Sequence, residues 1–143
     1  MVARGEHMEY FEIVPNKLYQ SSLPGRWDDL LPLGANVSVN LSDMSVPRTP
    51  PGWMSIRWEI EDGDLPDLSM LSTIADAVIA LINAGRVVTV NCIAGVNRAS
   101  LLTGLVVYRL GIAKGDDIVT YMRLKRPGAL ANATFAAYLS GLK

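Results

Sequence analysis

The residues with the clearest chemical pattern stand between two apolar segments. Cys92, Gly95 and Arg98 are spaced as Cys-x-x-Gly-x-x-Arg. The run from Arg86 to Val90 that precedes them is rich in β-branched residues and apolar on both faces, which is typical of a strand buried in a parallel sheet. The segment from Arg98 to Leu110 is largely apolar and predicts a helix. We therefore expect a strand, a loop and a helix, with Cys92 at the carboxyl end of the strand.

This loop has the chemistry of an anion site. Open α/β sheets bind ligands at the carboxyl ends of their strands, and a helix N-terminus offers unpaired N–H groups and a positive dipole end. We expect the Cys92 thiolate, the loop amides and the Arg98 guanidinium to point at one phosphate group. The predicted phosphate-binding residues are Ile93, Ala94, Gly95, Val96, Asn97 and Arg98. In the alternative interpretation Cys92 is a small buried hydrophobic residue, which would need neither Gly95 nor Arg98.

Composition limits the remaining possibilities. The chain has 143 residues, half of them apolar, which is enough for one domain with a core. Basic and acidic residues number 13 and 14, so no global field attracts nucleic acid or an anionic membrane. No apolar run reaches the roughly 18 residues of a membrane span, and no secretory signal is evident. We expect a cytoplasmic monomer with a flexible leader over residues 1–9 and a single catalytic domain over residues 10–143.

The single histidine and the single cysteine exclude several mechanisms. His7 lies in the polar leader, and Ser-His-Asp catalysis, Cys-His catalysis and histidine-ligated zinc all need a well-placed imidazole. One cysteine permits neither an internal disulfide nor a zinc site of several cysteines. The groups left to favour a Cys92 thiolate are the helix N-terminus and Arg98.

A second chemical candidate lies in the acidic stretch Glu61-Asp62-Gly63-Asp64-Leu65-Pro66-Asp67. Hydrolysis of a phosphate monoester needs a proton for the departing oxygen, and a carboxylic acid can supply it. Asp62 stands directly after a predicted strand and is our candidate acid, with Asp64 as the alternative. Asp67 is better placed to cap the next helix. Taken alone, such an acidic stretch is typical of a solvated turn beside a helix N-terminus, and it is the Cys92 loop that favours an acid here.

Two family resemblances bear on these residues. Val-Asn-Cys-Ile-Ala-Gly-Val-Asn-Arg resembles the signature loop of the cysteine-dependent protein phosphatases, His-Cys-x-x-Gly-x-x-Arg-[Ser/Thr]. The size and layout are similar to the compact dual-specificity phosphatases. Asp62-Gly63-Asp64 is similar to the Asp-x-Asp motif of the haloacid-dehalogenase enzymes, but Pro66 stands where that family continues differently. Shorter fragments extend the first resemblance: Leu18-Tyr19, Val39-Asn40-Leu41, Ile60-Glu61-Asp62 and Lys125-Arg126-Pro127-Gly128.

The phosphatase resemblance implies a fold and an activity. The fold would be a three-layer α/β sandwich, with a central, mostly parallel sheet and helices on both faces. The activity would be phosphate-monoester hydrolysis through a phosphocysteine on Cys92, with Arg98 binding the phosphate and Asp62 protonating the leaving group. No metal or organic cofactor would be required. The substrates would be phosphotyrosine, phosphoserine or phosphothreonine proteins, and the loop contains no lysine of the kind expected for a highly charged inositol phosphate.

Two positions differ from the common phosphatase pattern. Asn91 replaces the histidine before the cysteine, and Ala99 replaces the hydroxyl residue after the arginine, with Ser100 one position late. The resulting Gly-x-x-Arg-Ala loop is similar to that of the phosphatases of regenerating liver, which turn over slowly. These differences motivate an alternative function, a phosphate-recognition or partner-binding module with little turnover.

The remaining elements follow from periodicity and punctuation. A proline-rich, irregular stretch over residues 43–52 separates the third and fourth predicted strands. The predicted strands are 10–14, 17–21, 36–41, 53–60 and 86–90. The predicted helical segments are 26–33, the segment from the Asp67 cap to Gly85, 98–110, 115–124 and a last helix capped by Asn132.

Overall fold

Five strands form one mixed sheet in the computed structural model, which describes residues 8–143. His7 lies outside the described residues. The strand order is β1-β2-β5-β3-β4, and every neighbouring pair is parallel except β1 and β2. The mostly parallel central sheet is therefore confirmed. The strands are β1 (Tyr10–Val14), β2 (Leu18–Ser21), β3 (Val37–Asn40), β4 (Met54–Arg57) and β5 (Val88–Asn91).

The central strand is β5, as its apolar sequence predicts. It pairs in parallel with β2 on one side and β3 on the other, and all of its residues are buried. The register aligns Ser21, Asn40 and Asn91 at the carboxyl ends of these three strands. Cys92 follows directly, so the nucleophile candidate emerges at the middle of this sheet edge.

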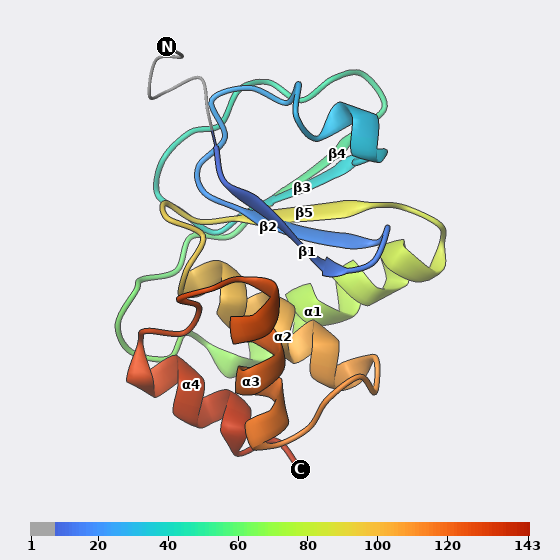
Figure 1. Cartoon of the computed structure of the whole chain (residues 1–143). Coiled ribbons are helices and arrows are strands. Elements are labelled where there is room, and N and C mark those ends of the chain that lie inside the picture. The colour runs from blue at the N-terminus through green and yellow to red at the C-terminus, as the bar shows by residue number, and fades with distance from the viewer. Residues whose placement is uncertain (1–7) are drawn as a thin grey trace.

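All the α-helices formed by the described residues lie on one side of the sheet (Figure 1). The other side carries loops and the short 3₁₀ helix η2 (Leu31–Leu33). The helical segment predicted over residues 26–33 is thus only a three-residue turn, ended by Gly34 with φ +84°. The two faces are covered unequally. The α-helices are α1 (Leu68–Asn83), α2 (Arg98–Arg109), α3 (Asp116–Lys125) and α4 (Ala133–Ser140).

Helix α2 is the helix most enclosed by the others. Its residues from Ala99 to Val107 are all buried, which fits a helix that is apolar almost all round. It packs against α1, α3, α4 and strands β2 and β5. The Asp67 and Asn132 caps are both confirmed, since Asp67 accepts from Ser69 N and Met70 N, and Asn132 accepts from Phe135 N. Helix α2, which begins directly after the predicted phosphate-binding loop, is thus enclosed by three helices and two strands.

Helix α3 is fixed to the edge strand β1. The Tyr121 hydroxyl donates to the Ile13 carbonyl, and burial raises the pKa of Tyr121. Burial also raises the pKa of Tyr19, whose hydroxyl donates to Glu12 Oε2 at 3.0 Å. The first contact holds α3 against β1, and the second links β2 to β1.

Strand β4 is shorter than its alternating sequence predicts. The strand predicted over residues 53–60 ends at Arg57, and its residues are largely exposed, because β4 is an edge strand. Beyond it, Trp58 N donates to Asn40 O at 3.0 Å, and Ile60 N donates to Leu41 O at 3.1 Å. The chain thus continues alongside β3 and delivers the acidic stretch to the sheet edge that carries Cys92.

At the N-terminal end, Glu9 is hydrogen-bonded to Ser22. Glu9 N donates to Ser22 Oγ at 3.1 Å, and Ser22 N donates to Glu9 O at 3.0 Å. The last residue of the predicted leader thus contacts the domain. Within residues 8–143, none of the helices combines the length and the apolar character needed to cross a bilayer.

Candidate active site

The phosphate loop, residues 92–97, connects β5 to α2. Cys92 is almost fully buried, with 2% of its surface exposed. Next to it, the side-chain amide of Asn91 donates to Asn40 Oδ1 at 3.0 Å and to the Cys92 carbonyl at 3.3 Å. Asn40 Oδ1 also accepts from the Ser42 hydroxyl at 2.8 Å. At the position of the family's histidine, Asn91 therefore ties β5 to β3.

Every carbonyl from residue 93 to residue 96 accepts a hydrogen bond from a neighbouring segment. The donors come from β2, from the segment that follows it and from the stretch after α3. They are Leu23 N to Ile93 O (2.8 Å), Arg126 Nη2 to Ala94 O (3.4 Å), Gln20 Nε2 and Arg126 Nε to Gly95 O (3.0 and 3.1 Å), and Leu130 N to Val96 O (3.0 Å).

The amides of the same loop differ from its carbonyls in their hydrogen bonding. No N–H from Ile93 to Arg98 donates to an acceptor among residues 8–143. Because the N–H and C=O of a peptide point in opposite directions, outward carbonyls turn amides toward the inside of the loop. A curled row of unpaired donors at a helix N-terminus is a binding site for a tetrahedral oxyanion.

Gly95 lies where the loop leaves no room for a side chain. Its φ is +70°, and a Cβ there would lie 2.6 Å from the carbonyl carbon and oxygen of Ser21 and 2.8 Å from Ser22 N. The loop therefore packs against the backbone at the end of β2 so closely that a side chain is excluded.

Arg98 is the first residue of α2 and is partly buried. Its Nη1 donates to Ile60 O at 3.3 Å, which aims the guanidinium across the site toward the acidic stretch. Its Nε is buried and has no acceptor within the described part of the chain. A buried donor without a partner is costly, and an oxyanion oxygen would supply the missing acceptor.

The acid loop, residues 61–67, meets the phosphate loop through Asp62. Asp62 Oδ2 accepts from Asn97 Nδ2 at 3.0 Å, and Asp62 Oδ1 accepts from Asn132 Nδ2 at 2.9 Å. Asp64 is exposed and its carboxylate makes no hydrogen bond to the described residues. Of the two candidate acids, Asp62 is the one bound to a residue of the phosphate loop.

Three contacts around the site were not predicted from the sequence. They are made by Gln20, by Arg126 and by Asn132, whose cap was predicted but whose bond to Asp62 was not. Gln20 is fully buried, and its Nε2 also donates to Ser100 Oγ at 2.6 Å. The Ser100 hydroxyl is therefore engaged on the β2 side of α2. A glutamine inside a buried strand was the available signal for Gln20, since buried amides need partners. Arg126 lay within a fragment that carried the family resemblance, but its contact could not be inferred.

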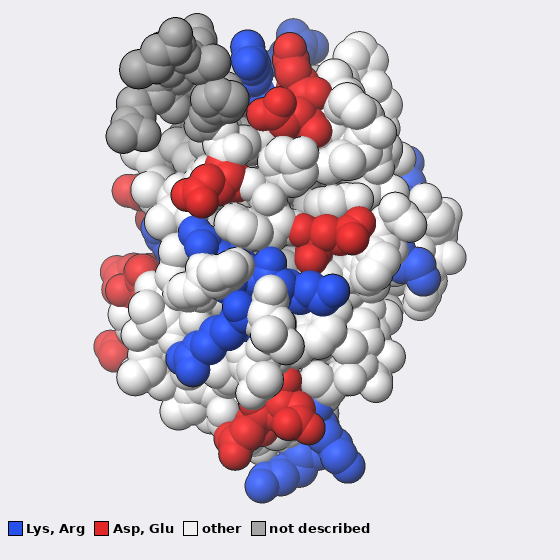
Figure 2. Space-filling view, in the orientation of Figure 1, with Lys and Arg blue, Asp and Glu red and all other residues white. Residues whose placement is uncertain are grey.

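Basic side chains gather on the face that carries these elements. Arg123 and Lys125 lie in the last turn of α3, and Arg126 follows them. The Arg126 guanidinium stacks on the Phe11 ring at 4.6 Å, and Lys125 lies over the Tyr121 ring at 5.5 Å. Figure 2 shows a stripe of Lys and Arg across the middle of this face, between groups of acidic side chains. Charge is thus locally sorted although the net charge is only −1.

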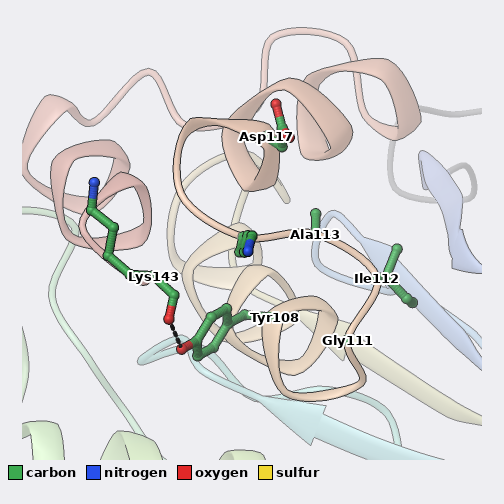
Figure 3. A pocket seen from close by; sticks show the side chains of 7 residues that line it. Tyr108, Gly111, Ile112, Ala113, Asp117 and Lys143 are labelled. Carbon is green, nitrogen blue, oxygen red and sulfur yellow. Dashed lines mark hydrogen bonds between the residues drawn. The ribbon is translucent and has the colours of Figure 1, made fainter.

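A separate cavity of about 580 Å³ lies at the other end of α2. Figure 3 shows Tyr108, Ile112 and Asp117 around it, with the Tyr108 hydroxyl donating to the Lys143 carbonyl at 2.8 Å. Because α2 has 12 residues and an α-helix rises about 1.5 Å per residue, this cavity is roughly 18 Å from the phosphate loop. None of the site residues predicted from the sequence lies in it.

No family model matches the chain. Curated relatives do: human protein tyrosine phosphatase type IVA 3 is 27% identical over 143 residues, covering 94% of this chain and 78% of the human protein. The mouse protein of the same name is 29% identical over 121 residues, covering 78% of this chain and 66% of the mouse protein. The chain thus spans just under two thirds of the mouse relative.

Solved structures show the same fold. Human DUSP28 matches with a TM-score of 0.80 at 22% identity, covering 91% of this chain and 89% of that chain. A mouse putative dual specificity phosphatase complexed with zinc tungstate gives 0.81 at 23% identity, covering 97% and 87%. Human tyrosine phosphatase-like serine/threonine/tyrosine-interacting protein gives 0.80 at 16% identity, covering 91% and 92%. In its Cys-x-x-Gly-x-x-Arg loop, in its curated relatives and in its fold, the chain is thus similar to the dual-specificity and type IVA cysteine-dependent protein phosphatases.

Proposed function

We propose that this protein hydrolyses phosphate monoesters through a phosphocysteine intermediate. In the first step Cys92 Sγ forms a bond to phosphorus while the bond from phosphorus to the leaving oxygen breaks. The amides from Ile93 to Arg98 and the Arg98 fork bind the three remaining phosphate oxygens. Asp62 transfers its proton to the leaving oxygen, which departs as a neutral alcohol or phenol.

In the second step water replaces the cysteine. Asp62, now ionised, takes a proton from the attacking water; the new bond from oxygen to phosphorus forms and the bond from sulfur to phosphorus breaks. The sulfur leaves as the thiolate, and inorganic phosphate is released. The chain's own groups therefore account for each proton and electron pair in the cycle.

The observation that carries the proposal is the polarity of the phosphate loop. Its carbonyls are satisfied by neighbouring segments, while its amides and Arg98 Nε have no acceptor in residues 8–143. The mouse structural relative complexed with zinc tungstate supports an oxyanion as the ligand, because tungstate is tetrahedral like phosphate.

The deciding experiment is turnover of p-nitrophenyl phosphate. We expect the wild-type protein to release nitrophenol and the Cys92→Ser protein to release none above background. Arg98→Lys should retain the charge but lose the bidentate fork, and weaken turnover at least about tenfold. Equal rates for wild type and Cys92→Ser would refute the proposal.

Phosphoproteins are the substrate class we propose. The type IVA relatives are named protein tyrosine phosphatases, and the cradle side chains Ile93, Ala94, Val96 and Asn97 add no cation beyond Arg98. A highly charged inositol phosphate would need such cations. A panel of phosphotyrosine, phosphoserine and phosphothreonine peptides should be hydrolysed in preference to soluble inositol phosphates, and the reverse preference would contradict this assignment.

A second candidate function is phosphate recognition with little turnover. Ala99 leaves no hydroxyl at the position after Arg98, and the Ser100 hydroxyl is engaged by Gln20. One structural relative is itself named a phosphatase-like interacting protein. This candidate predicts phosphopeptide binding that Arg98→Ala abolishes, together with negligible catalysis. A robust Cys92-dependent steady-state rate would exclude it.

A further inference from the structure

We propose that Asn97 and Asn132 are positioning residues that hold Asp62 over the phosphate loop in the pose from which it donates its proton. The inference rests on the proposed function, because it assigns a role within that reaction. Neither asparagine has to touch the substrate, since each acts through the Asp62 carboxylate.

The three residues form a closed ring of hydrogen bonds, the asparagine clamp. Asn97 Nδ2 donates to Asp62 Oδ2 at 3.0 Å, and Asn132 Nδ2 donates to Asp62 Oδ1 at 2.9 Å. The backbone N–H of Asn132 closes the ring by donating to Asn97 Oδ1 at 2.8 Å. Each carboxylate oxygen thus has its own donor, so both the position and the rotation of the carboxylate plane are fixed.

Asn97 shows that this ring is not a by-product of helix capping. Asparagine at an N-cap normally accepts from an amide in the first turn of its own helix. Asn97 is the N-cap residue of α2, yet its side chain makes no such bond. Instead its two polar atoms contact Asn132 and Asp62, which lie 35 positions away on either side.

Asn132 divides its side chain between two tasks. Its Oδ1 caps α4 by accepting from Phe135 N at 3.1 Å, while its Nδ2 donates to Asp62 and to Gly63 O at 3.0 Å. The acceptor and donor roles sit on different atoms. A residue that caps without a side-chain N–H would therefore remove the clamp and keep the helix.

The clamp has a direct consequence for catalysis. Asp62 is exposed, and an exposed carboxylate without partners samples several rotamers, so only some would face the leaving oxygen. A carboxyl oxygen has more than one lone-pair site, so Asp62 can carry its proton and still accept from both amides. The clamp therefore pre-forms the acid without blocking proton transfer.

The test compares two leaving groups in Asn132→Ser, because serine caps helices about as well as asparagine but lacks the Nδ2 donor. Phenyl phosphate needs a proton on its leaving oxygen more than p-nitrophenyl phosphate does. We expect kcat/KM to fall about tenfold or more for phenyl phosphate and about threefold or less for p-nitrophenyl phosphate. The comparison of the two losses reports on the first step alone, because kcat/KM includes only events up to release of the leaving group.

Two further variants separate positioning from folding. Asn97→Ser, which removes the other donor, should show the same leaving-group bias. In an Asp62→Ala background, adding Asn132→Ser should cost no further activity on phenyl phosphate, because no acid remains to be positioned. Equal losses on both substrates, or losses that add in the double variant, would overturn the proposal.

Hydrogen exchange separates this proposal from the proposed function. The amides of residues 60 and 132, which donate to Leu41 O and Asn97 Oδ1 in the wild type, should exchange at least about tenfold faster in Asn132→Ser, since the acid loop loses its anchor. Unchanged exchange would refute the clamp even in an active enzyme. A wild type without Cys92-dependent turnover would refute the proposed function, and the exchange result would still show whether the clamp holds the loop.

Discussion

The phosphate loop and the acid loop meet at one site but are held in different ways. The phosphate loop is fixed through its backbone, because each carbonyl from residue 93 to residue 96 accepts from another segment. The acid loop is exposed, and side-chain amides of Asn97 and Asn132 bind its Asp62. Backbone fixation brings the phosphate loop so close to the end of β2 that no side chain fits at Gly95, whereas the side-chain fixation of the acid loop can be changed by single substitutions.

We expect the largest effect from a comparison that places one alanine in each loop. In Gly95→Ala the new Cβ would lie 2.6 Å from the Ser21 carbonyl group at a φ of +70°, so the loop must move. We expect Cys92-dependent turnover to be lost, together with about 2 to 4 kcal/mol of the free energy of unfolding. Urea unfolding and p-nitrophenyl phosphate turnover measure the two effects.

Gly63→Ala is the matched control in the acid loop. No atom lies within 4 Å of a Cβ at Gly63, and its φ is not in the left-handed region. Stability should change by no more than about 0.5 kcal/mol, and turnover by no more than about twofold. Equal tolerance of alanine at both positions would show that the two loops are not held differently.

The difference between the two loops explains which features could be predicted from the sequence. The phosphate loop follows from local features: a buried strand, a glycine and an arginine at fixed spacing, and an apolar helix. The mostly parallel sheet and the Asp67 and Asn132 caps followed from local patterns in the same way. The helix predicted over residues 26–33 forms only as a 3₁₀ turn at Leu31–Leu33. Its end before Gly34 agrees with the prediction, but three apolar residues on one helical face cannot reveal that the turn begins only beside Pro32.

The contacts around Asp62 lie beyond local pattern. Asn132 is 70 positions from Asp62, and Gln20 is 75 positions from Gly95, so only the folded topology brings them together. The early end of β4 was also not predicted, because it too depends on the folded topology. Residues 58–60 keep an alternating sequence and still donate to Asn40 O and Leu41 O, but they no longer form a regular strand.

A second prediction distinguishes the two candidate acids of the acid loop. Asp62→Asn keeps the shape of the side chain but cannot deliver a proton, so kcat/KM for phenyl phosphate should fall about 100-fold or more. Asp64→Asn should stay within about twofold of wild type, because Asp64 makes no hydrogen bond to the described residues. If Asp64→Asn were the more damaging variant, the acid would be assigned to Asp64.

A third prediction concerns the step that limits turnover. In the second step the Cys92 sulfur departs with negative charge, and Ala99 offers it no hydroxyl donor. Losing one such donor costs on the order of 2 kcal/mol or more, about 30-fold in rate. We expect a burst of about one leaving group per active site followed by slow turnover, and we expect Ala99→Ser to raise the slow rate with little change in the burst.

The contrasting variant for this step is Ser100→Ala. Ser100 Oγ accepts from Gln20, so its removal should lower stability by about 1 kcal/mol and leave the ratio of burst to steady rate unchanged. Stopped-flow measurement of nitrophenol release reports both phases. Linear release from the first turnover, without any gain from Ala99→Ser, would show that the missing hydroxyl does not limit the rate.

The smallest expected effect concerns the support of the phosphate loop by Arg126. Its guanidinium donates to the Gly95 and Ala94 carbonyls at 3.1 and 3.4 Å, which helps to keep the loop amides turned inward. Gly95 O retains Gln20 as a second donor, so Arg126→Gln should weaken tungstate affinity only about 3- to 10-fold. Lys125→Gln removes the same charge from the same end of α3 without touching the loop. It should change the affinity by less than about twofold at 0.15 M salt, where distant charges are screened. The affinity is measured by competition of tungstate with substrate. If Arg126→Gln and Lys125→Gln weakened tungstate binding equally, Arg126 would act through its charge, and the loop would not need its hydrogen bonds.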